Sequence, residues 1–195
     1  PIPSTANRAM IGGMLGNNSS GTTSIEYGTT RDKVLEVKTL LADGSTAVFS
    51  DLDAETFQQK LRLTSLEGDI YRQMHARLSS PDQQEEIRTH FPKPSIHRRN
   101  TGYAVDALLH SSIYEPAAAP FNFGKLLAGS EGTLAITTEV KLKLDPLPFP
   151  DHVVVAAHFQ SISASLQATI TAMAHQPSAC ELMDKIILDC TKENL

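Results

Sequence analysis

The 195-residue sequence has no tryptophan and only two cysteines, Cys180 and Cys190. Two thiols cannot build a disulfide framework, so this composition favours a reducing compartment. The seven histidines show no metal-ligand spacing. His152 and His158 could share one face of a strand, but they would then lie about 20 Å apart. We therefore expect no metal site.

A basic excess and a long apolar run are also absent. The formal net charge is −5 and the isoelectric point is about 5.8, which provides no positive field for nucleic acid. No apolar stretch approaches the roughly 20 residues that a membrane-spanning helix needs. We expect a cytoplasmic protein, or one held peripherally at the inner membrane, that neither binds nucleic acid nor spans a membrane.

Three common nucleotide-binding or catalytic motifs are missing as well. The glycines of residues 12–16 lack the spacing of a dinucleotide-binding βαβ unit and precede a strand rather than a helix. No Gly-Lys-Ser/Thr triplet occurs, which excludes a Walker loop. The stretch GSEG at 129–132 lacks the G-x-S-x-G order of a hydrolase nucleophile elbow.

Alternating side chains predict an antiparallel sheet. In residues 35–41 every second side chain, beginning with Leu35, falls on one apolar face, and an Asp-Gly pair suited to a tight turn follows. This pattern predicts a β-hairpin over residues 34–49. Residues 134–144 alternate between aliphatic and polar side chains, which predicts a long strand with one solvated face.

Capping residues predict helices between these strands. Asp53 precedes a short helix containing Phe57, and Ser65 precedes a longer one. Ser80 and the proline after it are typical of an N-cap, an N1 proline and a capping box. The longer helix carries one apolar stripe, formed by Leu66, Ile70, Met74 and Leu78.

A proline-rich stretch divides the chain. The heptapeptide DPLPFPD at 145–151 predicts a domain boundary between residues 1–148 and residues 151–195. After it, HVVVAAHF predicts a strand over 152–159, and Ser161 predicts the start of a helix. The chain begins without an initiator Met and stops soon after a new apolar pattern begins, so we expect it to be part of a longer protein.

Two glycine-punctuated stretches, 11–21 and 129–133, each stand before a predicted strand. The first reads IGGMLGNNSSG and has no charged side chain. Glycine lets the backbone approach a ligand closely, and successive backbone N–H groups can bind anionic or carbonyl oxygens. The other interpretation is that both stretches are tight loops at the end of a sheet. Composition alone does not decide between the two.

Three motifs together resemble one family. The sequence IGGMLGNNSSG…YGTTRDKVLEVKTLLADG, the short motif RRNTGY and the sequence KLLAGSEGTLAITTEVKL are similar, in this order, to the flavin-binding domain of the FAD-linked oxidases. That family includes vanillyl-alcohol oxidase and the bacterial D-lactate and glycolate dehydrogenases. The resemblance covers about residues 2–148. It implies an α+β fold, in which an antiparallel sheet flanked by helices forms the second half of a PCMH-type FAD-binding domain.

The resemblance also implies which residues bind FAD and why glycine is needed. Without Cβ atoms, backbone amides can reach the isoalloxazine edge and the phosphates, and uncharged side chains bond a ligand whose charge is met elsewhere. The implied cofactor-binding residues are Pro3, Ser4, Thr5, Gly12, Gly13, Asn17, Asn18, Ser19, Ser20, Glu131, Gly132 and Ile136.

Some features depart from the family. The half-domain with the glycine-rich pyrophosphate loop is missing, residue 135 is Ala where many relatives have Gly, and LHSSIYEPAAAP is an insertion. The last two resemble the large FAD and iron–sulfur dehydrogenases, although two cysteines cannot hold a cluster. Arg99 or Tyr103 could contact the flavin or a substrate carboxylate. We favour instead a solvated basic loop with Tyr103 in the core.

The expected function is that of an FAD-dependent oxidoreductase. Its substrate would be a D-2-hydroxy acid of the D-lactate, glycolate or D-2-hydroxyglutarate type, and its electron acceptor a quinone, a cytochrome, or an iron–sulfur protein or domain. Residues 151–195 would begin a substrate-side α+β cap domain. No catalytic residue is assigned, and residues 1–195 alone are expected to bind FAD weakly and to be inactive. The alternative is a redox-inactive nucleotide-binding or structural module of the same fold.

Overall fold

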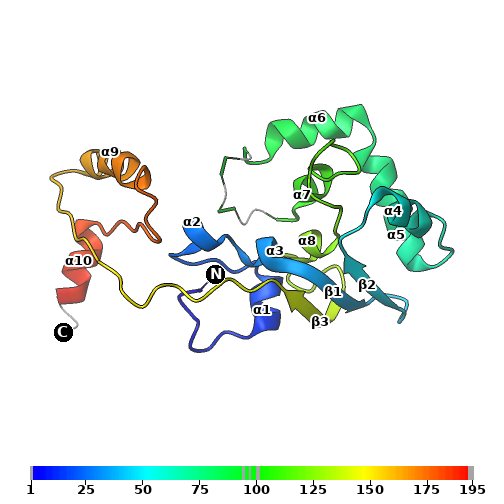
Figure 1. The fold of residues 1–195 in the computed structure, drawn as a ribbon, viewed down its shortest axis with the longest axis horizontal. Helices are drawn as coiled ribbons and strands as arrows, with labels where there is room; N and C mark the ends of the chain where they lie inside the picture. The colour runs from blue at the N-terminus through cyan, green and yellow to red at the C-terminus, as the bar shows by residue number, and fades with distance from the viewer. Residues whose placement is uncertain (1, 94, 97, 100–101, 193–195) are drawn as a thin grey trace.

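The computed structural model describes residues 2–93, 95–96, 98–99 and 102–192. Within them the chain has the predicted α+β fold, in which a three-stranded antiparallel sheet of order β2-β1-β3 is flanked by helices (Figure 1). The strands are β1 (Val34–Leu40), β2 (Thr46–Ser50) and β3 (Ile136–Leu142). The helices are α1 (Ile11–Gly16), α2 (Ser24–Tyr27), α3 (Thr30–Lys33), α4 (Ala54–Leu61), α5 (Leu66–Leu78), α6 (Pro81–His90), α7 (Val105–Leu109), α8 (Gly124–Leu127), α9 (Ile162–Met173) and α10 (Lys185–Lys192).

The predicted hairpin is confirmed as β1 and β2. Gly44 adopts φ +82 at its turn, a conformation that favours glycine. One part of the predicted pattern is wrong, because Leu35 is 37% exposed while Val34 is 1% exposed. The pairing of β1 with β3 is irregular between Val34 and Glu36. This irregularity changes the face on which the first residues of β1 lie.

Strand β3 is shorter and less regular than predicted. Its pairing with β1 skips Thr138, which instead donates from Oγ1 to the Lys38 carbonyl at 3.1 Å. The interruption breaks the period-two alternation. Ile136 is therefore 61% exposed, although the sequence places it on the apolar face. Leu144 lies beyond the end of the strand and is also exposed.

The predicted helix starts are confirmed, but the side chains of Ser65 and Ser80 make no capping hydrogen bond. The Asp53 carboxylate accepts a 2.7 Å bond from the Thr56 N–H at the start of α4, as an N-cap residue should. Ser80 stands at the N-cap of α6 with a proline after it, but its side chain makes no capping hydrogen bond. The predicted capping box at Ser80 is therefore wrong.

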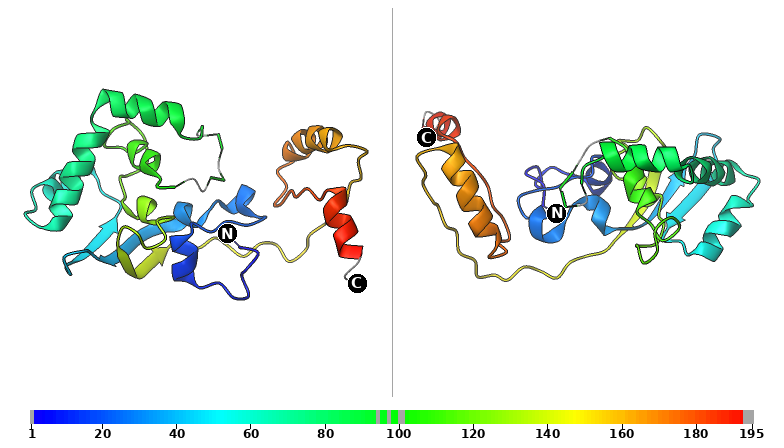
Figure 2. Two further views of the ribbon diagram at one scale, coloured as in Figure 1. Left: turned by 180° about the vertical axis from the view of Figure 1, so that it is seen from behind. Right: turned by 90° about the horizontal axis from the view of Figure 1, so that it is seen from above.

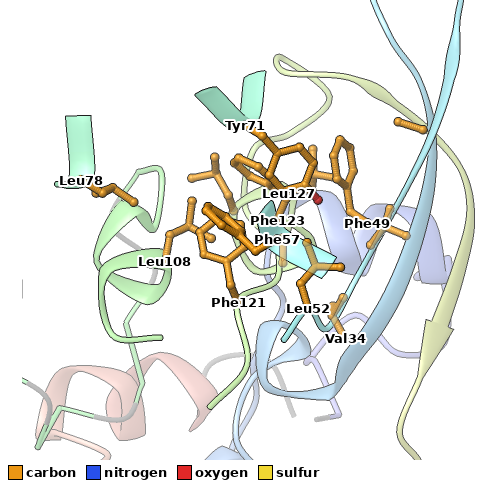
Figure 3. Packing of buried hydrophobic residues seen from close by; sticks show 14 of the residues in the cluster. Val34, Phe49, Leu52, Phe57, Tyr71, Leu78, Leu108, Phe121, Phe123 and Leu127 are labelled. Atoms are coloured by element: carbon orange, nitrogen blue, oxygen red, sulfur yellow. The ribbon is translucent and has the colours of Figure 1, made fainter. Parts of the chain in front are cut away.

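The core is an aromatic cluster between the hairpin and the helices (Figure 3). Rings of β2, α4, α5 and the segment before α8 pack mainly edge to face. Tyr71 lies 4.8 Å from Phe123 between ring centroids, and Phe57 lies 4.9 Å from Phe121. Burial of large rings in this geometry is the main stabilising contribution to the sheet-and-helix body. The buried rings are Phe49, Phe57, Tyr71, Phe121 and Phe123.

The last part of the chain stands away from the sheet (Figure 1, Figure 2). Residues 143–161 contain no helix or strand and lead to α9 and α10. The predicted strand over 152–159 is wrong, because no described segment pairs with it, and Val153–Val155 are more than 80% exposed. The predicted helix is confirmed as α9, where the Ser161 hydroxyl accepts from the Ala164 N–H at 3.2 Å.

Candidate cofactor site

The two glycine-punctuated stretches lie against each other. The Gly129 N–H donates to the Leu15 carbonyl at 3.0 Å, and the Glu131 N–H donates to the Gly16 carbonyl at the same distance. A Cβ added to Gly16 would stand 3.6 Å from the Glu131 Cα. More than 110 residues therefore separate two backbone segments that the fold joins directly. A shared binding surface requires that the two stretches lie side by side, and this contact confirms that they do.

The local conformation of the first stretch differs from the expected loop. Residues 11–16 form the short helix α1, so Gly12 and Gly13 lie on a helix rather than in a turn. Both are exposed, and a Cβ at either would meet no atom within 4 Å. The space beside them is open, which leaves room for a ligand to approach the backbone.

A cavity of about 260 Å³ opens beside this contact. Aliphatic side chains and bare backbone form most of its wall. No charged side chain lines it, which suits the rings of a nucleotide or flavin better than an anion. Its lining residues are Gly12, Leu15, Gly16, Leu127, Ser130, Gly132, Ala135, Ile136 and Thr137.

A second cavity of about 230 Å³ is polar. Four of its lining residues adopt positive φ: Asn18 at +48, Glu131 at +52, Gly102 at +53 and Gly129 at +96. Positive φ at non-glycine residues is uncommon and clusters at ligand sites. The remaining lining residues are Asn17 and Arg31.

Arg31 is the residue that sequence reasoning missed. It is only 6% exposed, and its side chain donates from Nε to the Lys125 carbonyl at 2.9 Å and from Nη2 to the Ala128 carbonyl at 2.7 Å. Burial first, and the nearby Arg99 charge second, lower the pKa of the Arg31 guanidinium. It stands inside the quoted YGTTRDK motif, but an arginine in a sequence normally indicates a solvated side chain, so no pattern marked it.

The asparagines and serines of the first stretch have separate environments. Asn18 is 1% exposed; its Oδ1 accepts from the Arg31 N–H at 2.8 Å, and its Nδ2 donates to the Arg99 carbonyl at 3.5 Å. Ser19 is 7% exposed, and its carbonyl accepts from both the N–H and the hydroxyl of Thr30. Asn17 is exposed, and Ser20 is half-buried. Asn18 therefore lines the polar cavity and also fixes the segment that leads into β1.

The N-terminal segment lies at the far end of the same stretch. A Cβ on Gly21 would stand 1.8 Å from the Ile2 carbonyl oxygen, so only glycine permits the observed approach. The turn that follows is closed by the Ala6 N–H, which donates to the Pro3 carbonyl at 2.9 Å. Ser4 and Thr5 are exposed within it. The fold thus brings Ile2 and the nitrogen of Pro3 against the end of the glycine-rich stretch, and Ser4 and Thr5 follow in the adjoining turn.

The basic segment before α7 is exposed at residues 93, 95, 96 and 98, as the favoured solvated loop should be, but Arg99 is half-buried. Arg98 donates from Nε to the Ser20 hydroxyl at 3.1 Å, and Arg99 forms an ion pair with the buried Asp106. Tyr103 is 44% exposed rather than buried in the core, and its hydroxyl lies 2.7 Å from the Thr133 hydroxyl. The preferred interpretation of Tyr103 is therefore wrong. Asn100, which belongs to the same RRNTGY motif, lies outside the described residues.

The site's geometry fits an extended cofactor with both rings and an anionic group. The cavity of α1 and β3 offers aliphatic walls and backbone without Cβ atoms. The cavity at Asn18 offers a buried guanidinium and short polar side chains. Among the described residues no three His, Cys, Asp or Glu side chains are arranged to hold a metal ion. The described helices include none that is long and apolar enough to cross a membrane.

The sequence comparisons agree with this geometry. Residues 1–50 match the family model described as FAD binding domain. A D-2-hydroxyglutarate dehydrogenase of Pseudomonas putida is 34% identical over 189 residues, which cover 96% of this chain and 18% of that protein. The D-2-hydroxyglutarate dehydrogenase of Escherichia coli is 30% identical over 195 residues, covering 100% of this chain and 18% of that protein.

A third relative, the mitochondrial D-lactate dehydrogenase [cytochrome] of Arabidopsis thaliana, is 24% identical over 181 residues, or 91% of this chain and 21% of that protein. The chain thus spans about a fifth of the length of the curated relatives that it matches. The α+β fold is consistent with the FAD binding domain that the family model describes. The comparisons confirm the predicted family: the chain belongs to the FAD-linked oxidases, and FAD is the cofactor that they indicate.

Proposed function

We propose that the protein carrying this chain is an FAD-linked dehydrogenase that oxidises a D-2-hydroxy acid. One observation carries the proposal: proteins named D-2-hydroxyglutarate dehydrogenase align with 96% to 100% of the chain, at 30% to 34% identity in the two cases above. D-2-hydroxyglutarate is accordingly the first substrate to test, and D-lactate and glycolate are the alternatives. The joined glycine-rich stretches supply the binding surface that such chemistry needs.

The proposed FAD contacts are those that the sequence implied, divided between the two cavities. Gly12, Gly132 and Ile136 line the aliphatic cavity, where backbone without bulk can lie against a ring. Asn17, Asn18 and Glu131 line the polar cavity. The other proposed contacts stand around them, and they are Pro3, Ser4, Thr5, Gly13, Ser19 and Ser20.

The chain's own residues would bind and orient rather than react. Bound FAD supplies a hydride acceptor, so that the α-carbon of the hydroxy acid loses a hydride, its hydroxyl loses a proton to a base, and a 2-oxo acid forms. The backbone at the start of α1 would lie against the flavin, and the GSEG stretch would hold α1 in place through the Gly129 and Glu131 N–H groups, which donate to the Leu15 and Gly16 carbonyls. No described side chain is assigned as the base.

We also propose the arrangement beyond the FAD-binding part. Residues 1–148 would form the FAD-binding domain and residues 151–195 the start of a substrate-side cap domain; the extended segment before α9 and the exposed apolar residues of α9 support this division. Electrons would pass on to a quinone, a cytochrome, or an iron–sulfur protein or domain. The chain has only two cysteines and both are exposed, which suits a reducing compartment, so we propose a cytoplasmic or peripheral inner-membrane location.

Anaerobic flavin reduction tests the function directly. The complete protein that carries residues 1–195 should show the visible absorption of a bound flavin, and adding D-2-hydroxyglutarate should bleach it. D-lactate and glycolate are added in parallel, and the L-enantiomers serve as controls. A flavoprotein that none of the hydroxy acids bleaches contradicts the substrate class. A colourless protein that does not take up FAD contradicts the redox function and favours the inactive module.

A further inference from the structure

The wall of the polar cavity contains a buried cation without a carboxylate partner. Arg31 is 6% exposed, and its recorded side-chain hydrogen bonds go to two neutral carbonyls, those of Lys125 and Ala128. None of the ion pairs formed between described residues includes Arg31. A buried charge is costly unless it is paired, so its retention here calls for a compensating group.

The charged side chains near Arg31 do not fully compensate its positive charge. Asp106 is nearby, but its Oδ2 is already paired with Arg99, and Arg99 itself opposes the charge of Arg31. Asp32 attracts Arg31 through space, while its carboxylate accepts from the Thr29 N–H at 2.7 Å to close a capping box. Two arginines therefore face one buried aspartate beside the cavity.

A second cation, Lys125, adds to the excess of positive charge around Arg31. Lys125 is half-buried, and its Nζ donates to the Arg31 carbonyl at 3.0 Å and to the Val34 carbonyl at 3.1 Å. Arg31 and Lys125 thus each bond the other's backbone carbonyl. Burial lowers the pKa of Lys125 as it does that of Arg31. These two reciprocal bonds fix Lys125 next to Arg31, which lines the polar cavity.

We propose that the polar cavity binds a diphosphate, and that Arg31 is the cation that holds it. The inference rests on the proposed function, since the diphosphate is the one anionic group of oxidised FAD. It also answers how the uncharged stretch 11–21 can face such a ligand: the charge comes from α3, which follows that stretch in the chain. Asn17 and Asn18 line the same cavity, and the amide of the exposed Asn17 can donate to a phosphate oxygen.

One group in the cavity opposes an anion. Glu131 is exposed and lines the same space, so its carboxylate would repel a diphosphate or turn to solvent. The proposal therefore predicts different effects on diphosphate binding when the two charges are removed. Removing the charge of Arg31 should weaken diphosphate binding, and Glu131→Gln should leave it unchanged or strengthen it.

The test compares two ligands that differ only in the diphosphate. FAD is removed from the complete protein, and ADP and adenosine compete with FAD for the apo-protein, with flavin fluorescence as the readout. The variants are Arg31→Met, which removes the charge and the planar fork, and Arg31→Lys, which keeps the charge alone. Arg77→Met, at an exposed arginine of α5, is the matched control. Circular dichroism checks that each variant is folded.

We expect Arg31→Met to weaken ADP about tenfold or more, as the loss of a charge-assisted hydrogen bond does, and to leave adenosine unchanged. Arg31→Lys should lie between, and Arg77→Met should match the unsubstituted protein. If Arg31→Met does not fold, the ratio of ADP to adenosine affinity in Arg31→Lys decides, and it should fall.

Three results would count against the proposal in different ways. Equal weakening of ADP and adenosine in the folded variants would mean that Arg31 only supports the loops, and this overturns the proposal. An unchanged ADP affinity overturns it as well. In both cases the proposed function survives, because the unsubstituted protein still binds FAD. A protein that binds no FAD at all overturns the proposed function together with this inference.

Discussion

Replacing Gly12 by Ala should improve the fold and impair the site. Gly12 lies in α1, a Cβ there would meet no protein atom within 4 Å, and the residue lines the aliphatic cavity. The new methyl group would therefore project into the space where the cofactor is proposed to lie. Because the backbone of α1 is helical, alanine adopts it without strain, and the two effects can be separated.

The expected magnitudes follow from this geometry. Glycine is about 1 kcal/mol less favourable than alanine in a helix interior. Near the start of a six-residue helix we expect about half of that, or about 0.5 kcal/mol of added stability. Overfilling a packed contact typically costs about 1–3 kcal/mol, so FAD affinity should fall about fivefold to a hundredfold.

Two measurements on the apo-protein test the prediction. Urea unfolding should show a higher midpoint for Gly12→Ala, and FAD titration should show a higher dissociation constant. Gly44→Ala is the matched control, because its Cβ also meets nothing but its φ of +82 strains any other residue. That variant should lose about 1–2 kcal/mol of stability and keep its FAD affinity. If Gly12→Ala binds FAD as tightly as before, the cavity beside α1 is not the cofactor site.

Three further predictions concern the described contacts. Gly21→Ala places a Cβ 1.8 Å from the Ile2 carbonyl oxygen, so it should lower the free energy of unfolding by about 1–3 kcal/mol. It should also speed limited proteolysis before residue 8, and unchanged cleavage would contradict this close approach. Arg99→Met removes the cation that pairs with the buried Asp106 carboxylate and should lower the free energy of urea unfolding by about 3–5 kcal/mol. A second change, Asp106→Asn, should restore part of this loss; additive costs would mean that the two residues do not interact. The Tyr71 hydroxyl is buried with no hydrogen-bond partner among the described residues, and burial raises its pKa. The tyrosine of the unfolded chain therefore ionises first, and stability should fall as pH rises above about 10. Tyr71→Phe should be neutral or up to about 1 kcal/mol more stable at pH 7 and should lose less stability in alkali; an identical alkaline slope would refute the role of Tyr71 in this pH dependence.

Local chemistry in the sequence was enough to determine several elements. The Asp-Gly turn of the hairpin, Asp53 at the start of α4 and Ser161 at the start of α9 act through atoms within a few residues, so the chain needs no distant partner to specify them. The family could also be predicted from the order of three motifs. In each of these cases the deciding information lies within a short stretch of residues or in their order along the chain.

Other predictions failed where a distant partner decides the structure. Whether residues 152–159 become a strand depends on a neighbouring strand, and no described segment supplies one. The face on which Leu35 lies depends on its irregular pairing with β3, about a hundred residues away. Period-two alternation indicates that a segment can pair as a strand, but it does not determine which residues of the neighbouring strand it pairs with.

The site itself is a product of the tertiary structure. The sequence determined that two glycine-rich stretches exist and that a flavin-binding family resembles them. Only the fold joins Gly129 to Leu15 and buries Arg31 against the carbonyls of residues 125 and 128. Burial of a charged side chain depends on every surface that packs around it, and those surfaces come from segments far apart in the chain.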